Sequence, residues 1–123
     1  MGIGKQNNDD RFYKGYEGEP ELILSSDEKS IHIWDGYMED IFGNPVQNED
    51  GWYGFTRDYN EFVGPYEDNC IEVCLNLDEY IKDAEAYVGK KFEYEESSEV
   101  LKTIIDFLRK SYDDGKTVMV SLK

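Results

Sequence analysis

The sequence predicts an α+β protein, with a small mixed or antiparallel sheet of about four to six strands and two helices from the C-terminal half packed on one face. Three observations predict this class. Two aliphatic runs, 21–26 and 30–35, flank a short polar turn, two later segments repeat apolar residues at helical spacing, and the last residues alternate as in a strand. A chain of 123 residues is expected to form a single domain, 1–123.

The first third of the chain predicts a hairpin after a polar start. Residues 1–20 are rich in glycine and polar side chains, so we expect a loosely ordered N-terminal segment. The runs ELILSS (21–26) and SIHIWD (30–35) then form the two strands. Because side chains alternate along a strand, Ile31 and Ile33 share one face of the sheet, and His32 and Trp34 share the other.

The middle of the chain has no clean periodicity. The segment GNPVQNEDG (43–51) has the composition of a turn, and WYGFTR (52–57) is expected to form a short strand. The run DYNEF (58–62) predicts about one turn of helix. Together the residues from 51 to 69 hold six aromatic side chains and four acidic ones.

The second half predicts strand, helix, helix and strand. CIEVCLN (70–76) alternates, and Asn76 followed by Glu79 resembles a capping box at the start of a helix. A second helix is expected to open at Ser97 or Ser98 and to end at DDG, before the strand KTVMVSLK (116–123). If the last strand lies beside 70–76, the helical connection permits a parallel pair.

Charge narrows the classes of partner. The chain has 28 acidic and 13 basic residues, for a formal net charge of −15. Such a field repels the phosphates of nucleic acids and anionic membranes, whose binding needs cationic contacts. It favours basic proteins or cations, although many acidic proteins gain only solubility from their charge.

The sequence gives no sign of export or membrane insertion. It has no apolar stretch of about 18 residues and no apolar run for a signal peptide. Cys70 and Cys74 are too far apart on one strand to form a disulfide, so we expect both to be reduced and mostly buried. These features predict a cytoplasmic protein.

No catalytic, cofactor-binding or metal-binding residues are predicted. His32 is the only histidine and belongs to no nucleophile motif, and the pattern of a calcium loop fails around Gly51. Neighbouring carboxylates occur throughout the chain, so no single pair marks a glycosidase-type site. We expect no enzyme activity and no cofactor, with a small carboxylate-based enzyme as the remaining rival.

Aromatic and acidic residues alternate between residues 34 and 69, a composition typical of binding surfaces. Tyrosine and tryptophan are favoured at binding hot spots, and carboxylates add steering and specificity toward a basic partner. The alternative is that the tyrosines only cover a small core. We expect Phe55 and Phe62 to be buried, and the following residues to bind a partner: Trp34, Asp35, Tyr37, Glu39, Asp40, Trp52, Tyr53, Asp58, Tyr59, Glu61, Tyr66, Glu67 and Asp68.

This small, acidic, tyrosine-rich chain resembles the immunity proteins of bacterial polymorphic toxin and contact-dependent growth inhibition systems. The segment SSEVLKTIIDFLRKSYDDGKTVMVSLK (97–123), about a fifth of the chain, is similar to the C-terminal helix and strand of the barstar family, which inhibits basic ribonucleases. The earlier helices and the inhibitory segment of that family have no match here, so no inhibitory residue is carried over.

The resemblance implies a protein that occludes the active site of a cognate basic toxin domain, such as a nuclease. An acidic adaptor, or a DNA mimic that binds another basic protein, fits the same composition. The sequence leaves the oligomeric state and the order of the strands open.

Overall fold

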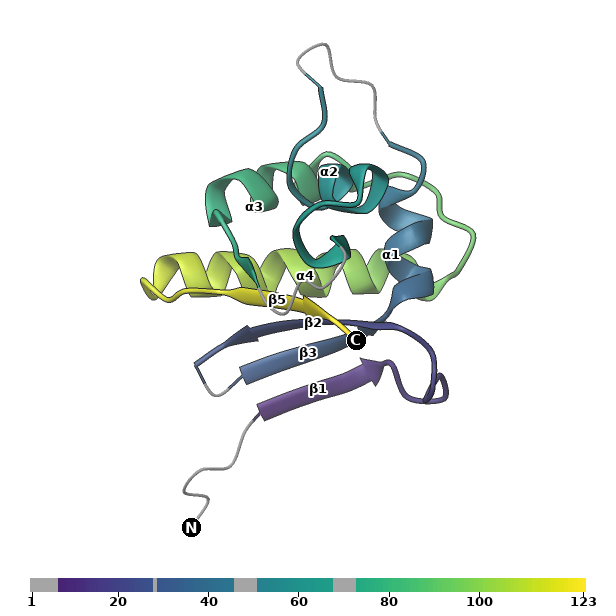
Figure 1. Ribbon diagram of the computed structural model, residues 1–123, viewed down its shortest axis with the longest axis horizontal. Coiled ribbons are helices and arrows are strands. Elements are labelled where there is room, and N and C mark those ends of the chain that lie inside the picture. The colour runs from purple at the N-terminus through teal and green to yellow at the C-terminus, as the bar shows by residue number, and fades with distance from the viewer. Residues whose placement is uncertain (1–6, 28, 46–50, 68–72) are drawn as a thin grey trace.

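The computed structural model describes residues 7–27, 29–45, 51–67 and 73–123, and it has the predicted α+β class (Figure 1). The elements lie along the chain in the order β1 (Asn7–Phe12), β2 (Glu21–Ser26), β3 (Lys29–Trp34), α1 (Asp35–Phe42), α2 (Gly54–Glu61), the 3₁₀ turn η1 (Gly64–Tyr66), β4 (Val73–Cys74), α3 (Leu77–Glu85), α4 (Glu96–Asp113) and β5 (Met119–Leu122).

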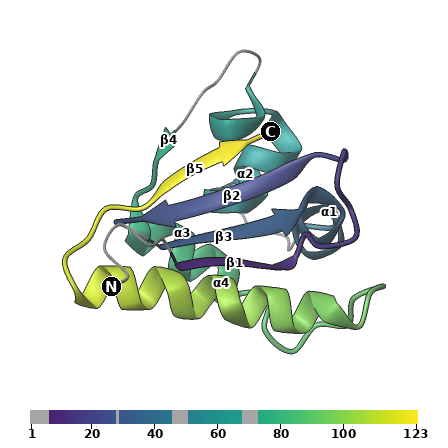
Figure 2. The ribbon, with the colours of Figure 1, turned by 90° about the horizontal axis from the view of Figure 1, so that it is seen from below.

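One mixed sheet forms the base of the molecule. Its strand order is β1-β3-β2-β5-β4, with β1 parallel to β3 and all other neighbours antiparallel. The helices gather above one face of this sheet in Figure 1, and Figure 2 shows the long helix α4 running across it. The core lies between the sheet and the helices, where aliphatic side chains of β2, β3 and β5 meet those of α4.

The predicted hairpin is confirmed. Strands β2 and β3 pair antiparallel, with Leu22 opposite Ile33 and Leu24 opposite Ile31. All four of these side chains are buried, while His32, on the other face, is half-buried. The alternation of apolar and polar residues in 30–35 therefore predicted correctly that Ile31 and Ile33 share one face of the sheet.

The N-terminal segment is more ordered than the sequence predicted. Residues 7–12 form β1, the edge strand beside β3, and Phe12 is buried in the core. The prediction of a loosely ordered segment over 1–20 was wrong for this part, because β3 supplies a pairing edge that local composition does not reveal.

The two predicted helices of the second half are confirmed. The side-chain Oδ1 of Asn76 accepts a hydrogen bond of 3.4 Å from the N–H of Glu79 at the start of α3. Helix α4 buries Leu101, Ile104 and Leu108, but Tyr112, expected on the same stripe, is exposed.

The structure decides the direction of the last strand, for which the sequence permitted a parallel pair. Strands β4 and β5 pair antiparallel, through Val73 with Val120 and Cys74 with Met119. Two helices, α3 and α4, connect these strands and pack against each other, so the connection is not a single helical crossover. A single helical crossover would have given a parallel pair. Residues 70–72 of the predicted strand lie outside the described residues. Cys74 is exposed, not buried as expected.

One helix, α2, replaces the strand and the helical turn expected over residues 52–62. Its first turn is capped from a distance, because Oδ2 of Asp83 on α3 accepts a hydrogen bond of 2.9 Å from the N–H of Thr56. Gly54 has a φ of +60°, and a Cβ there would lie 2.8 Å from that of Asp83. A capping residue 27 positions away is invisible to local sequence patterns.

Candidate partner-binding surface

The structure places the sequence-predicted binding residues in three environments. Glu39, Trp52, Glu61 and Glu67 are exposed, and Tyr37 and Asp58 are buried. Asp68 lies outside the described residues. Half-buried positions are taken by Trp34, Asp35, Asp40, Tyr53, Tyr59 and Tyr66.

Asp58 is a core residue, and its prediction as a binding residue was wrong. Its side chain is 0% exposed and accepts a hydrogen bond of 2.6 Å from the hydroxyl of Tyr80. A guanidinium nitrogen of Arg57 lies 3.3 Å from its other oxygen. Burial raises the pKa of the Asp58 carboxyl, whereas the hydrogen bond from Tyr80 and the charge of Arg57 lower it. Asp58 therefore joins α2 to α3 inside the molecule.

Tyr37 is also a core residue, in an aromatic cluster at the end of β3. Its ring meets Trp34 edge-on, with centroids 5.2 Å apart. Trp34 stacks on Tyr16 with a centroid distance of 4.0 Å, and its indole N–H donates to Glu19. Trp34 is therefore held by its own chain, and its indole is less available to a partner than the sequence predicted.

Asp40 has an internal role as well. Its carboxylate accepts hydrogen bonds from the backbone N–H groups of Glu93 and Tyr94, both at 2.9 Å, and from the hydroxyl of Ser97 at 2.6 Å. These bonds fasten the segment before α4 to α1. They use the Asp40 carboxylate for folding, in contrast to the prediction that it faces a partner.

Four of the predicted residues converge where α1, α2 and η1 meet. The hydroxyl of Tyr66 donates to Oδ1 of Asp35 over 2.7 Å, and the rings of Tyr59 and Tyr66 meet edge-on at 5.3 Å. Glu39, one helical turn after Asp35, contacts the hydroxyl of Tyr59. Two carboxylates and two phenols thus form one group at the junction of the three elements.

The charges of this group are not balanced internally. Burial, together with the charge of Glu39, raises the pKa of Asp35 even though Tyr66 donates to it. Burial and the nearby carboxylates raise the pKa of Tyr59 to about 12, and that of Tyr66 is raised for the same reasons. Within the described residues, no Lys or Arg forms an ion pair with Asp35 or Glu39.

Phe62 is the residue of this surface that sequence reasoning missed. It was expected to be buried, but it is 70% exposed and stands at the C-terminal end of α2 with a φ of +55°. This left-handed conformation costs a non-glycine residue about 1 kcal/mol or more. Phe62 directly follows the last residue of α2, so it stands at the end of the helix three positions after Tyr59.

We define the acidic–aromatic surface as the group of Asp35, Glu39, Tyr59 and Tyr66, together with three exposed residues close to it in the chain. These seven residues combine three aromatic side chains with four carboxylates. They are Asp35, Glu39, Tyr59, Glu61, Phe62, Tyr66 and Glu67.

Trp52 and Tyr53 lie at the other end of α2, about 12 Å from Phe62 along the helix axis. Trp52 is 38% exposed, and the ammonium of Lys82 lies 5.9 Å from the centre of the Tyr53 ring. The structure therefore separates these two predicted residues from the acidic–aromatic surface, although both remain accessible.

His32 has polar neighbours that deserve comparison with a catalytic triad. Its Nε2 lies 3.2 Å from the hydroxyl of Ser30, and its Nδ1 lies 3.3 Å from Oε1 of Glu21. Acyl transfer also needs backbone N–H donors aimed at the developing oxyanion. Strand β3 pairs with β1 on one side and β2 on the other, so its N–H groups serve the sheet. The arrangement fits a surface hydrogen-bond network.

Neither a metal site nor a membrane-spanning helix is found in the described parts of the chain. No group of three or more His, Cys, Asp or Glu side chains there is arranged to hold a metal ion. None of the helices combines the length and apolar character needed to cross a bilayer. Comparison with family models, with curated proteins and with solved structures gives no match to this chain.

Proposed function

We propose that this protein is an immunity-type inhibitor, which binds a basic protein domain through its acidic–aromatic surface and covers that domain's active site. The observation that carries the proposal is Phe62, a large apolar side chain held in the open by a strained backbone at the end of α2, the helix whose Tyr59 contacts Glu39. Strained, exposed residues concentrate at functional sites.

The chemistry of the surface defines the partner that would fit it. Phe62 and Tyr59 supply rigid apolar area, as hot-spot residues do. Asp35 and Glu39 would accept Arg or Lys side chains of the partner, which would relieve the repulsion between the two carboxylates. The net charge of −15 would attract a basic domain from a distance, in a manner that weakens as salt increases.

Binding of a basic toxin domain, sought among the products of the genes that neighbour the gene for this chain, tests the proposal. We expect Phe62→Ala and Glu39→Gln to weaken binding in calorimetry, with a loss of about thirtyfold for Phe62→Ala, because hot-spot truncations cost about 2 kcal/mol or more. Tyr112→Ala and Asp113→Asn are matched controls, since both residues are exposed on α4. Equal binding by all four variants would refute this surface as the interface.

Two other functions remain as rivals. An acidic adaptor or DNA mimic would use the same charge but bind a DNA-binding protein, and capture of such a protein in place of a toxin would favour it. A small enzyme would need turnover dependent on a carboxylate or on His32. Loss of toxin inhibition without loss of the fold in Phe62→Ala separates the inhibitor from both.

A further inference from the structure

The helix-facing side of the sheet changes from apolar to polar at its hairpin end. Along β2 the inward positions read Leu22, Leu24 and then Ser26, and along β3 they read Ile33, Ile31 and then Lys29. Ser26 and Lys29 are paired directly, and Asp9 of β1 pairs with Ile31. Three adjacent strands thus turn polar side chains toward α4.

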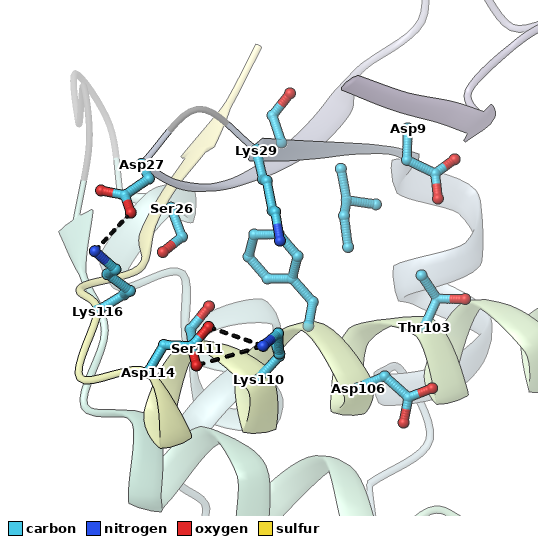
Figure 3. A pocket seen from close by; sticks show the side chains of 13 residues that line it. Asp9, Ser26, Asp27, Lys29, Thr103, Asp106, Lys110, Ser111, Asp114 and Lys116 are labelled. Carbon is cyan, nitrogen blue, oxygen red and sulfur yellow. Dashed lines mark hydrogen bonds and ion pairs between the residues drawn. The ribbon is translucent and has the colours of Figure 1, made fainter. Parts of the chain in front are cut away.

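Helix α4 faces this polar end with small and polar residues. Thr103, Asp106, Phe107, Lys110 and Ser111 recur at helical spacing on the side that looks toward the hairpin. Because Ser26, Thr103 and Ser111 are small, the helix and the sheet do not close on each other. They leave a pocket of about 410 Å³, within the usual range for small-molecule sites (Figure 3).

Two opposite charges that line this pocket, Lys29 and Asp106, form no ion pair within the part of the chain that the structure describes. Lys110 pairs with Asp114 at 3.1 Å, Lys116 pairs with Asp27 at 3.0 Å, and Asp9 pairs with Arg11 outside the pocket. Among the described residues, no such pair involves Lys29 or Asp106. Figure 3 shows the Lys29 side chain reaching from the hairpin toward α4, between the ion pairs and Asp106.

The inward position of Lys29 is not explained by protection of a sheet edge. Inward-pointing charges can protect the edge strand of a sheet from aggregation, but β3 lies between β1 and β2. The pocket is also separate from the acidic–aromatic surface. Lys29 begins β3 and Asp35 follows its end, so about 20 Å of strand lies between them.

We propose that this pocket binds a small zwitterion, an α-amino acid with an apolar side chain. Its ammonium group pairs with Asp106, its carboxylate pairs with Lys29, and its side chain rests on Phe107 and Ile31. The hydroxyls of Ser26 and Ser111 supply further donors to the carboxylate. A ligand without net charge is not repelled by the strongly acidic molecule, whereas a simple anion is.

Titration of the full ¹⁵N-labelled chain with L-phenylalanine tests this proposal by NMR. We expect saturable shifts confined to residues 26–31 and 103–116 at concentrations up to about 10 mM, the range of weak ligands. Two analogues each lack one charged group: L-phenylalanine amide lacks the carboxylate, and N-acetyl-L-phenylalanine lacks the ammonium group. The affinity of each should be lower than that of L-phenylalanine by about tenfold or more, because each loses a charge-assisted contact.

Variants of Lys29 and Asp106 test whether these two charges bind L-phenylalanine. Lys29→Gln and Asp106→Asn should each weaken L-phenylalanine binding about tenfold, and Lys29→Gln should remove the preference for phenylalanine over its amide. Lys102→Gln, on the same helix but outside the pocket, is the matched control and should bind normally. The absence of saturable shifts in the wild-type chain, or equal binding of phenylalanine and its amide, would overturn the proposal, even if a variant failed to fold.

Discussion

The hydroxyl of Tyr66 donates a hydrogen bond of 2.7 Å to Oδ1 of Asp35, which ties η1 to the first turn of α1. Because that bond stabilises the ionised carboxylate, it opposes the effect of burial on the pKa of Asp35. The acidic–aromatic surface therefore depends on a contact between segments 31 residues apart.

Tyr66→Phe isolates this contact, because it removes only the hydroxyl. We expect the pKa of Asp35 to rise further and the protein to lose about 1 kcal/mol of stability at neutral pH. Carbon-detected NMR titration of the Asp35 carboxyl measures the first effect, and urea unfolding measures the second. An unchanged titration of Asp35 would mean that the hydrogen bond is not populated in solution.

Phe62→Gly tests the exposed, left-handed position at the end of α2. Glycine adopts a positive φ without strain, and the Phe62 ring that is removed is already exposed. The free energy of unfolding should therefore stay the same or increase by up to about 1 kcal/mol. Phe55→Gly, on the buried side of the same helix, should lose about 3 kcal/mol or more. A comparable loss in both variants, measured by chemical denaturation, would show that Phe62 is packed.

Asp83 predicts a dependence of stability on pH. Burial raises its pKa from 3.8 to about 6, despite the hydrogen bonds from Thr56. The folded state therefore binds more protons than the unfolded state between those values, and stability should fall as pH rises from about 4 to about 6. Over this pH range the free energy of unfolding should decrease by about 3 kcal/mol.

Asp83→Asn provides the matched comparison for this pH dependence. The amide oxygen can still accept from Thr56, but the group no longer titrates. Urea unfolding at about pH 4.5 and about pH 7.5 should give a smaller difference for the variant than for the wild type. An identical difference in both proteins would assign the pH dependence to other carboxyls.

Asp58→Ala should damage the fold more than binding-surface replacements do. It leaves Arg57 and the Tyr80 hydroxyl without their buried partner, which costs about 3 kcal/mol or more. Glu61→Ala, three positions later on the exposed side, should change stability by less than about 0.5 kcal/mol. Chemical denaturation of the two variants distinguishes a buried structural carboxylate from a surface one.

Local patterns predicted those parts of the fold that are stabilised locally. The hairpin follows from alternation in 21–26 and 30–35, and α3 follows from the cap at Asn76 and its apolar stripe. Strand β1 and helix α2 could not be predicted in the same way. One depends on an edge offered by β3, and the other on a cap offered by Asp83 from another helix.

The candidate site was predicted in composition but not in detail. Sequence reasoning identified the aromatic and acidic segment, and four of its residues do converge in Asp35, Glu39, Tyr59 and Tyr66. It could not decide which side of α2 is buried, because it expected a strand over residues 52–57 and only about one turn of helix over 58–62. Asp58 was therefore placed on the surface and Phe62 in the core, the reverse of what the structure shows.

The pairing of β2 with β5 has a consequence for how the chain folds. Leu22 lies opposite Leu122, so the centre of the sheet joins residues one hundred positions apart. Closing so long a loop is slow compared with forming local helices, because its entropy is lost before the contacts form. During synthesis, one edge of β2 would stay unpaired until β5 leaves the ribosome. Folding speed, and the risk of aggregation in that interval, should therefore respond most to changes in β5.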